Sequence, residues 1–582
     1  MRNHTNAGPH PMNANAKQDA TFDVVVIGSG AGAMTAAIRA ADQGLSVVVI
    51  EQSDQYGGTS AVSGGAVWIP NNHQIAALGG SDSADEALAY LKAATRGEVA
   101  EERLRAYVDG APRMVRYLEE KTRLRYRAVP AYADYYQDLA GAKPGFRSMD
   151  PMPFHAAELG PEFLRLREQS PGMLVFGRMT MTTFEAHTLM SRMHGWKKVA
   201  LGMGLRYWLD LPWRLRSRRD RRLAMGNALV GALRRSMMDR NIPLWLDTAF
   251  ESLHMDGGRI TGVALRRDGR PLRVDAARAV ILAAGGFERN QEMRERYLPT
   301  PTSSRWSATP PVNSGAGIRA GMAVGAAVAL MDQAWWTPTV AVPGEEKQRG
   351  LFFERHLPHS IVVNGRGQRF ANEAGPYLDF VDAMYADHAK TGATLPAWLI
   401  FDAEFRRKYP CGPMLPGSVR PDGKLPPEWL GTVYHRADTL AGLARQIGVD
   451  AEGLARSVEL NNSYAATGED LQFGKGGNAY DRFYGDPSVR PNCCIGPISR
   501  GPFYAVPLDA GEIGTKGGLL TNEHAMVLDL AGAPIPGLYA IGNTSASITG
   551  RSYPGAGATL GPAMTFGFIA ANHISGDSHA ER

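Results

Sequence analysis

The sequence predicts an α/β protein of two domains, in which one domain is interrupted by the other. A strand, a glycine-rich turn, a helix and a second strand follow one another between Phe22 and Glu51, a unit typical of parallel nucleotide-binding sheets. Another glycine-rich segment follows a strand near residue 540, at the far end of the chain. The length of 582 residues also exceeds that of one ordinary domain.

These observations divide the chain. Residues 1–20 lack the apolar core of a signal peptide, so we expect a disordered leader there. Nucleotide-binding segments at both ends predict a Rossmann-type domain formed by residues 21–340 and 500–575. An α+β substrate domain at 341–499 is then inserted between the two parts. No run reaches the roughly 18 apolar residues that a membrane span needs, which predicts a soluble protein.

The composition argues against two classes of function, nucleic-acid binding and metal binding. A net charge of +5 is too small for this length to indicate nucleic-acid binding, and no base-reading motif accompanies it. The three cysteines are Cys411, Cys493 and Cys494, which form neither a CxxC motif nor a zinc-like cluster. We therefore expect no metal site and a reducing, cytoplasmic setting.

The turn after the first strand reads Gly28, Ser29, Gly30, Ala31, Gly32, Ala33. Its first glycine permits the tight turn, Gly30 lets the backbone approach a pyrophosphate, and Ala33 fits close helix-to-strand packing. The helix amino terminus that follows favours phosphate charge. Glu51 ends the second strand, where its carboxylate can accept hydrogen bonds from ribose hydroxyls.

Three further segments resemble the flavin-contacting parts of two-domain FAD enzymes. They are "YGGTSAVSGGAVWIP" (56–70), "AVILAAGGFERN" (279–290) and "GLYAIGNTSASITG" (537–550). Non-covalent FAD is therefore the expected cofactor. The contacts expected in these segments and in the late glycine loop are Gly58, Thr59, Ser60, Ser63, Gly64, Gly65, Ala284, Gly285, Gly542, Asn543, Thr559 and Leu560. Because no second GxGxxG motif offers a nicotinamide site, electrons should leave for another, unidentified acceptor.

On these segments the chain resembles the FAD-dependent fumarate reductase and 3-ketosteroid dehydrogenase superfamily. The segment "SYPGAGATLGPAMTFG" (552–567) closely resembles the C-terminal motif of 3-ketosteroid 1-dehydrogenases. Further matches follow in the same order along the chain, at 330–338, 369–385, 398–410, 435–448, 479–487 and 514–522. The resemblance implies desaturation of the bond between carbons 1 and 2 of the A ring of a 3-ketosteroid, in steroid degradation.

The resemblance also assigns roles at the reacting ring. The Tyr553 hydroxyl and the Gly557 backbone N–H would bind the 3-keto oxygen and stabilise the charge that develops on it. This stabilisation acidifies the proton on carbon 2. A base then removes that proton while hydride leaves carbon 1 for the flavin.

The family places the base, a tyrosine, in the inserted domain. The "AMY" segment favours Tyr385, with Tyr377 in reserve. A second tyrosine hydrogen-bonds the base, and Tyr135 matches it best, although Tyr136 stays open. A tyrosine titrates near ~10, so its phenolate needs neighbouring donors or positive charge. Plausible apolar walls for a steroid are Trp335, Trp336, Phe352 and Phe353.

Other functions stay open as alternatives. A 3-ketosteroid 4-(5α)-dehydrogenase uses similar tyrosines at carbons 4 and 5. A reductase of unsaturated acids fits less well, because Gly514 and Thr559 stand where that branch has its carboxylate-binding His and Arg. A flavin-binding scaffold or a membrane-associated electron carrier is the non-enzymatic alternative.

Residues 197–223 form a local charge anomaly. This segment carries nine Lys or Arg against two Asp, interleaved with Trp208 and Trp213. Basic and aromatic residues together suit an anionic membrane surface. A solvated helical face that happens to be basic is the simpler alternative. The segment therefore predicts, at most, peripheral contact with the inner face of the membrane.

Overall fold

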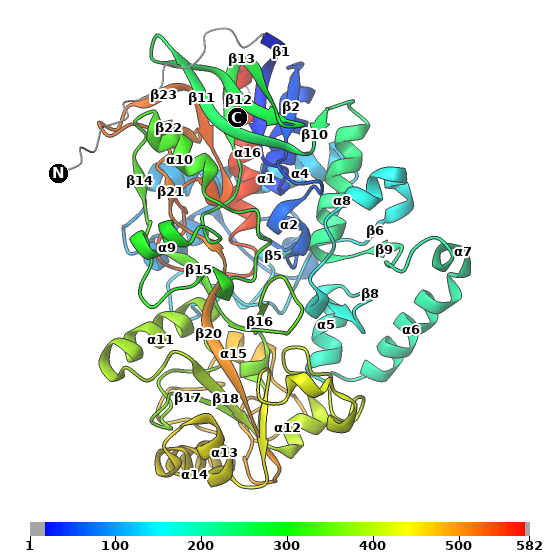
Figure 1. Cartoon of the computed structure of the whole chain (residues 1–582), viewed down its shortest axis with the longest axis vertical. Helices are drawn as coiled ribbons and strands as arrows, with labels where there is room; N and C mark the ends of the chain where they lie inside the picture. The colour runs from blue at the N-terminus through cyan, green and yellow to red at the C-terminus, as the bar shows by residue number, and fades with distance from the viewer. Residues whose placement is uncertain (1–17, 577–582) are drawn as a thin grey trace, which may run out of the picture.

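The computed structural model describes residues 18–576 (Figure 1). Most of the predicted leader at 1–20 lies outside the described residues. Its last three positions belong to the first strand, which begins at Gln18. The α/β fold class that the sequence predicts is confirmed, because a largely parallel sheet and a second, antiparallel sheet account for the two halves of the molecule.

The first sheet lies at the top of Figure 1. It contains β1 (Gln18–Ile27), β2 (Val47–Ile50), β10 (Leu244–Trp245), β11 (Thr248–Asp256), β12 (Arg259–Arg267), β13 (Arg270–Leu282), β22 (Met526–Leu528) and β23 (Pro534–Ala540). The strand order is β10-β2-β1-β13-β12-β11, and β23 pairs with the end of β13. Strands β10, β2, β1, β13 and β23 run parallel. The late segment near residue 540 thus joins the sheet that the amino-terminal segment begins.

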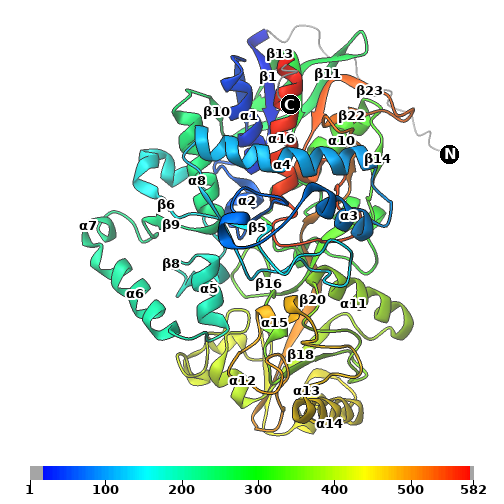
Figure 2. The same ribbon diagram turned by 180° about the vertical axis from the view of Figure 1, so that it is seen from behind.

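Helices cover this sheet because its central strands are continuous apolar runs. The covering helices include α1 (Ala31–Asp42), α4 (Glu101–Lys121), α8 (Met225–Met238) and α16 (Leu560–Ser575). Figure 2 shows α4 lying across α16 on the rear side. The backbones of α1 and α16 approach closely, since a Cβ on Gly32 would lie 2.6 Å from the Ala563 carbonyl oxygen. This contact brings the carboxyl-terminal loop beside the glycine turn.

The second sheet is antiparallel. It contains β15 (Ala334–Val340), β16 (Arg349–Gly350), β17 (Ser360–Val363), β18 (Ala397–Phe401), β19 (His435–Ala437) and β20 (Phe503–Thr515). Its helices are α11 (Tyr377–Thr391), α12 (Ala403–Lys408), α13 (Leu440–Ile447) and α14 (Ala451–Thr467). Both β15 and β20 lie beyond the predicted limits of 341–499. We therefore propose that the inserted domain extends over 334–515.

Shorter elements connect these layers. The helices are α2 (Gly58–Val62), α3 (Ala84–Thr95), α9 (Gln291–Tyr297), α10 (Ala316–Ala323) and α15 (Ala479–Phe483). The strands are β3 (Val67–Trp68), β4 (Tyr126–Ala128), β5 (Ser148–Pro151), β6 (Phe154–His155), β7 (Leu174–Val175), β8 (Met179–Thr180), β9 (Arg222–Leu223), β14 (Val328–Ala329) and β21 (Gly518–Leu519). At the side of the molecule, α5 (Thr183–Met190), α6 (Trp196–Leu209) and α7 (Leu211–Arg214) project outward (Figures 1 and 2).

Candidate active site

One cavity of about 920 Å³ receives residues from both ends of the chain and from the inserted domain. Every residue that the sequence predicts to contact the cofactor lines it. They are Gly28, Ser29, Gly30, Ala31, Gly32, Ala33, Glu51, Gly58, Thr59, Ser60, Ser63, Gly64, Gly65, Ala284, Gly285, Gly542, Asn543, Thr559 and Leu560. The predicted segments are thus brought together around one cavity.

The glycine turn has the geometry that a pyrophosphate needs. Gly28 has a φ of +108°, and a Cβ there would lie 2.3 Å from the Ala283 carbonyl oxygen, so only glycine fits. Gly30 is the N-cap of α1 and makes no side-chain capping bond. The Ala31 N–H donates to Ser60 Oγ at 3.0 Å, and the N–H groups of Gly32 and Ala33, which also line the cavity, belong to the helix end that favours an anion.

Glu51 is buried beside this turn. Its carboxylate accepts a hydrogen bond from the Ser29 hydroxyl (2.5 Å) and another from the Ser53 backbone N–H (3.0 Å). Ser29 in turn accepts the Gly57 N–H at 2.9 Å. Burial raises the pKa of the Glu51 carboxyl above its ordinary value, so further donors are needed to favour the charged form. The ribose hydroxyls of FAD are donors of this kind, and the residues present therefore fit the cofactor.

A cluster of tyrosines from four distant segments lines another part of the cavity. The ring centroids of Tyr135 and Tyr553 are 5.1 Å apart, and Tyr377 lies 5.1 Å from Tyr553. The hydroxyl oxygens of Tyr135 and Tyr377 are 3.5 Å apart. Tyr480 packs against Tyr135 at 4.4 Å. Burial raises the pKa of each of these four phenols, so the resting cluster is neutral.

The loop that carries Tyr553 is fixed by its backbone. The Pro554 carbonyl accepts bonds from the Tyr90 hydroxyl (2.6 Å) and the Tyr135 N–H (3.0 Å). Gly557 has a φ of +95°, and a Cβ there would lie 2.5 Å from the backbone of Val67. Glycine is therefore required at 557, at the close approach of two cavity-lining segments.

Tyr136, the alternative left open beside Tyr135, bridges the cluster rather than lining the cavity. Its hydroxyl accepts the Tyr553 N–H at 3.0 Å and donates to Asp379 Oδ1 at 3.0 Å. Asp379 lies two residues after Tyr377 on α11. Burial raises the pKa of Asp379 to about 6, although the hydrogen bond from Tyr136 acts to lower it. The bridge thus links the loop at 553 to the helix that begins at Tyr377.

Tyr136→Phe is expected to lower kcat/KM about 10- to 100-fold, because a lost bridge lets Tyr553 and Tyr377 shift relative to each other. Steady-state kinetics and FAD absorbance check this effect. Tyr117→Phe is the matched control, since Tyr117 donates to Asp42 at 2.6 Å outside the cavity. Equal kinetics for the two variants would remove Tyr136 from a positioning role.

Tyr385, the tyrosine that the sequence favours as the base, is not brought to the cluster. Its hydroxyl donates to the Pro301 carbonyl at 3.3 Å, and its ring packs on Trp336 at 5.3 Å. Tyr385 does not line the cavity, whereas Tyr377 does. Their separation of eight positions on α11 corresponds to about 12 Å along the helix, so one helix cannot present both to the same ring.

Two of the four wall residues that the sequence predicts lie at the cavity. Phe352 and Phe353 line the cavity, but Trp335 and Trp336 do not. Trp335 packs edge-on against the Tyr553 ring and donates to Asn543 Oδ1 at 3.1 Å, so it supports the wall from behind. Sequence reasoning missed a set of apolar lining residues, which are Met173, Met179, Met181, Met190, Met203 and Met225. Methionine is common in cores, so no motif distinguishes these positions.

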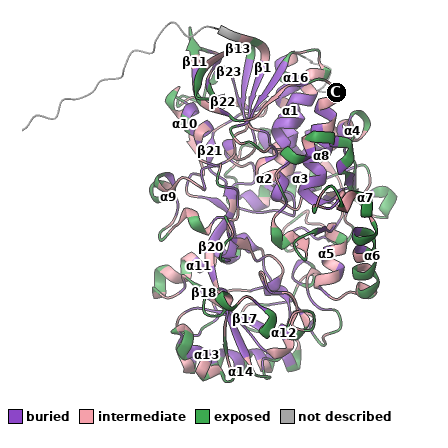
Figure 3. Ribbon diagram, turned by 45° about the vertical axis from the view of Figure 1, so that its right-hand side comes forward, coloured by how far each residue is buried: buried purple, intermediate pink, exposed green. Residues whose placement is uncertain are grey.

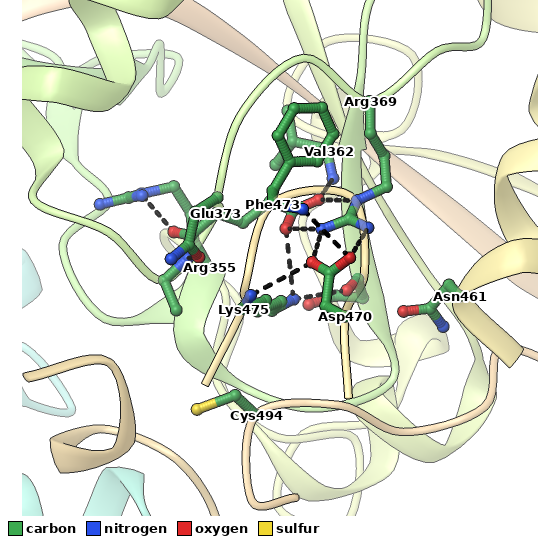
Figure 4. A network of polar contacts seen from close by, with 12 residues as sticks. Arg355, Val362, Arg369, Glu373, Asn461, Asp470, Phe473, Lys475 and Cys494 are labelled. Atoms are coloured by element: carbon green, nitrogen blue, oxygen red, sulfur yellow. Dashed lines mark hydrogen bonds and ion pairs between the residues drawn. The ribbon is translucent and has the colours of Figure 1, made fainter. Parts of the chain in front are cut away.

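A buried ionic network holds the segment that leads into α11 (Figure 4). Arg369 bonds both carboxylate oxygens of Glu373 (2.7 Å each) and both of Asp470 (3.1 and 2.7 Å). Lys475 Nζ lies 3.9 Å from Glu373. Burial disfavours the charge on Glu373, but Arg369 and Lys475 hold the pKa of this carboxyl below its ordinary value. Two cations thus neutralise two carboxylates, one of which, Glu373, lies four residues before Tyr377.

Arg369→Met is expected to cost about 3–5 kcal/mol in the free energy of unfolding, because two buried carboxylates lose their main partner. Urea unfolding followed by fluorescence measures the loss. Arg366→Met is the control, since Arg366 is exposed and bonds only the Thr391 carbonyl through its side chain. A loss below about 1 kcal/mol, as for an exposed pair, would contradict this account of the network.

The glycine turn, the buried carboxylate and the tyrosine cluster on one cavity define a flavin-dependent oxidoreductase. A family model for an FAD binding domain matches residues 23–560. The 3-oxosteroid 1-dehydrogenase of Comamonas testosteroni is 42% identical over 569 residues, which cover 95% of this chain and 96% of the relative. The chain belongs to the 3-oxosteroid 1-dehydrogenase family of FAD-binding proteins.

Two further proteins are informative relatives. The crystal structure of 3-ketosteroid delta1-dehydrogenase from Sterolibacterium denitrificans, in complex with 1,4-androstadiene-3,17-dione, is 58% identical with a TM-score of 0.94. The match covers 96% of this chain and 100% of that one. The 4-oxocyclohexanecarboxylate 2-dehydrogenase of Sinomonas cyclohexanicum is 38% identical over 572 residues, which cover 96% of this chain and 93% of the relative.

Proposed function

We propose that the protein is an FAD-dependent 3-oxosteroid 1-dehydrogenase, which introduces a double bond between carbons 1 and 2 of the A ring. One observation supports this proposal most strongly. Tyr135, Tyr377, Tyr553 and Gly557, from three separate segments, line the same cavity as the cofactor-binding turn. Such an arrangement supplies hydroxyl and N–H donors to a ring ketone without any charged group in the cluster.

The 3-keto oxygen is proposed to bind between the Tyr553 hydroxyl and the Gly557 N–H. Both donors favour the enolate-like charge that develops on this oxygen, and a fixed loop avoids the cost of reorganising them. The proton on carbon 2 thereby becomes acidic. Bound FAD supplies the acceptor for the hydride of carbon 1.

Tyr377 is proposed as the base that takes the proton from carbon 2, in place of Tyr385. Tyr135 can donate a hydrogen bond to the Tyr377 oxygen over the 3.5 Å that separates the hydroxyls, which favours the phenolate. Burial nevertheless raises the pKa of Tyr377 well above its ordinary value, so the phenolate is a minor species near neutral pH.

The rate should therefore rise with pH. Burial raises the pKa of Tyr377, so below that pKa the phenolate fraction grows about tenfold per pH unit. We expect kcat/KM to increase through pH 6–9, with a slope of about 1 in log units until another step limits the rate. A plateau that begins below pH 7 would indicate a more acidic base than this tyrosine.

The substrate is proposed to be a steroid rather than a small ring ketone. The apolar methionine and phenylalanine wall offers a large surface for a steroid nucleus, whose binding relies on buried area. The test compares kcat/KM for androst-4-ene-3,17-dione and 4-oxocyclohexanecarboxylate with an artificial electron acceptor. A preference of at least 100-fold for the steroid is expected. The reverse preference would indicate a dehydrogenase of small ring ketones instead.

Among residues 18–576, no helix is long and apolar enough to cross a membrane. We propose that the enzyme works in the cytoplasm, in peripheral contact with the inner face of the membrane, and that a separate carrier accepts its electrons. The basic segment at 197–223 supports the membrane contact.

A further inference from the structure

Lys347 is a half-buried cation of the cavity wall that has no carboxylate partner. It lies in the loop between β15 and β16, at residues 341–348, and therefore comes from the inserted domain. Figure 3 shows the strands of the two sheets as two separate purple groups, and this loop belongs to the lower sheet, which contains β17 and β18. Within residues 18–576, no Asp or Glu forms an ion pair with the Lys347 amine.

Two acids of the same loop do not supply the missing negative charge. Glu345 binds Arg349, whose Nε lies 2.9 and 3.1 Å from the two carboxylate oxygens. Glu346 is exposed to solvent, where its charge is screened. Burial lowers the pKa of Lys347 to about 8, and nearby arginines lower it further, although the two acids act to raise it. The loop thus holds an ammonium group that the protein does not neutralise.

The two arginines beside Lys347 lack a carboxylate partner as well. Arg167 donates to the Ser53 hydroxyl at 2.8 Å, and Arg289 donates to backbone carbonyls, among them that of Ser304 at 3.1 Å. Neither arginine forms an ion pair with an acid in the part of the chain that the structure describes. Neither lines the cavity, so both add positive potential from behind Lys347. Three cations without a paired acid at a cavity indicate an anionic ligand.

Hydrogen bonds connect Lys347 to the glycine turn of the other domain. Lys347 Nζ donates to Ser170 Oγ at 2.5 Å, and the Ser170 hydroxyl donates to the Val62 carbonyl at 3.3 Å. Val62 is the last residue of α2. Ser60, two residues earlier in this helix, accepts the Ala31 N–H of the turn at 3.0 Å. The lysine therefore lies near the segment that contacts the glycine turn.

We propose that Lys347 binds the pyrophosphate of FAD, while Arg167 and Arg289 add attraction from behind. The two phosphates carry the full negative charges of oxidised FAD, and lysine is a common phosphate ligand. Arg167 also acts to lower the pKa of the Glu51 carboxyl, the group expected to bind the neighbouring ribose. The phosphates are thus held from two domains, by the amino end of α1 on one side and by Lys347 on the other.

Release of FAD from the purified holoenzyme tests this site. Lys347→Met should weaken FAD binding about 10- to 100-fold, since a hydrogen bond to a charged group contributes a factor of this size. Equilibrium dialysis of the diluted holoenzyme gives the Kd, with free flavin measured by its absorbance. Lys408→Met is the matched control and should keep the wild-type Kd, because Lys408 lines the same cavity but pairs with Glu404 at 3.0 Å. Equal affinity in Lys347→Met and wild type would overturn the proposal.

Two further variants separate the charge of Lys347 from its bond to Ser170. Lys347→Gln keeps a side-chain donor but removes the charge, so it should weaken FAD binding nearly as much as Lys347→Met. Ser170→Ala removes the bond but leaves the ammonium, and should change the Kd by less than about threefold. If Ser170→Ala releases FAD as readily as Lys347→Met, the lysine is a latch between the domains, and that result would contradict phosphate binding.

A phosphate-bearing ligand other than FAD is the competing source of the anion. Calorimetric titration of the holoenzyme with inorganic phosphate distinguishes the two sources. We expect no binding, because the phosphates of bound FAD already occupy Lys347. Phosphate binding to the wild-type holoenzyme that is lost in Lys347→Met would assign the site to a second ligand and overturn the FAD assignment. None of these measurements uses a steroid, so their outcome is independent of the proposed function.

Discussion

Tyr377→Phe is expected to lower kcat by about 10²–10⁴-fold while the purified protein keeps its yellow flavin. General-base catalysis contributes a factor of this size, and phenylalanine preserves the ring packing against Tyr553 while removing the proton acceptor. Because Tyr377 is first in α11 and follows Pro376, its loss should not unwind the helix. Stopped-flow measurement of flavin reduction isolates the chemical step.

Tyr385→Phe is the decisive comparison, since it removes a hydroxyl eight residues later on the same helix. Loss of the hydrogen bond to the Pro301 carbonyl should leave kcat within about twofold, because this hydroxyl does not line the cavity. The reverse pattern, with Tyr385→Phe inactive and Tyr377→Phe active, would restore the assignment that the sequence favours.

Tyr553→Phe is expected to lower kcat about 10²–10³-fold, because one of the two donors to the developing oxyanion is removed. The effect should fall mainly on kcat rather than on KM, since the hydrogen bond strengthens as charge develops on the oxygen. The Gly557 N–H remains and accounts for residual activity.

Tyr539→Phe is the matched control for this change. Tyr539 lies in the same domain, and its hydroxyl bonds His573 at 2.7 Å away from the cavity. If Tyr553→Phe raises KM but leaves kcat unchanged, the Tyr553 hydroxyl binds the ground state and the transition state equally. That result would contradict its proposed role in stabilising the oxyanion.

The flavin-binding segments could be predicted from sequence because backbone demands restrict residue type. Gly28 and Gly557 occupy positive φ at close backbone contacts, where no other residue fits without strain. Such positions leave a pattern of glycines that sequence alone displays. Long apolar strands similarly predicted the parallel sheet.

The choice between Tyr377 and Tyr385 could not be made in this way. Both lie on one helix, and which end of that helix meets the cavity depends on how α11 packs against β15, a long-range contact. The predicted boundaries at 340 and 500 differ from the proposed limits of 334 and 515 for a related reason. Strands β15 and β20 are apolar in sequence, but only their pairing with each other assigns them to the second sheet.

Anaerobic mixing of the yellow protein with androst-4-ene-3,17-dione tests the central claim most directly. We expect rapid bleaching of the flavin absorbance and a product with a new double bond between carbons 1 and 2, located by mass spectrometry and NMR. Bleaching with 5α-reduced steroids alone would place the reaction at carbons 4 and 5. Absence of bleaching with any 3-ketosteroid would contradict the proposed function.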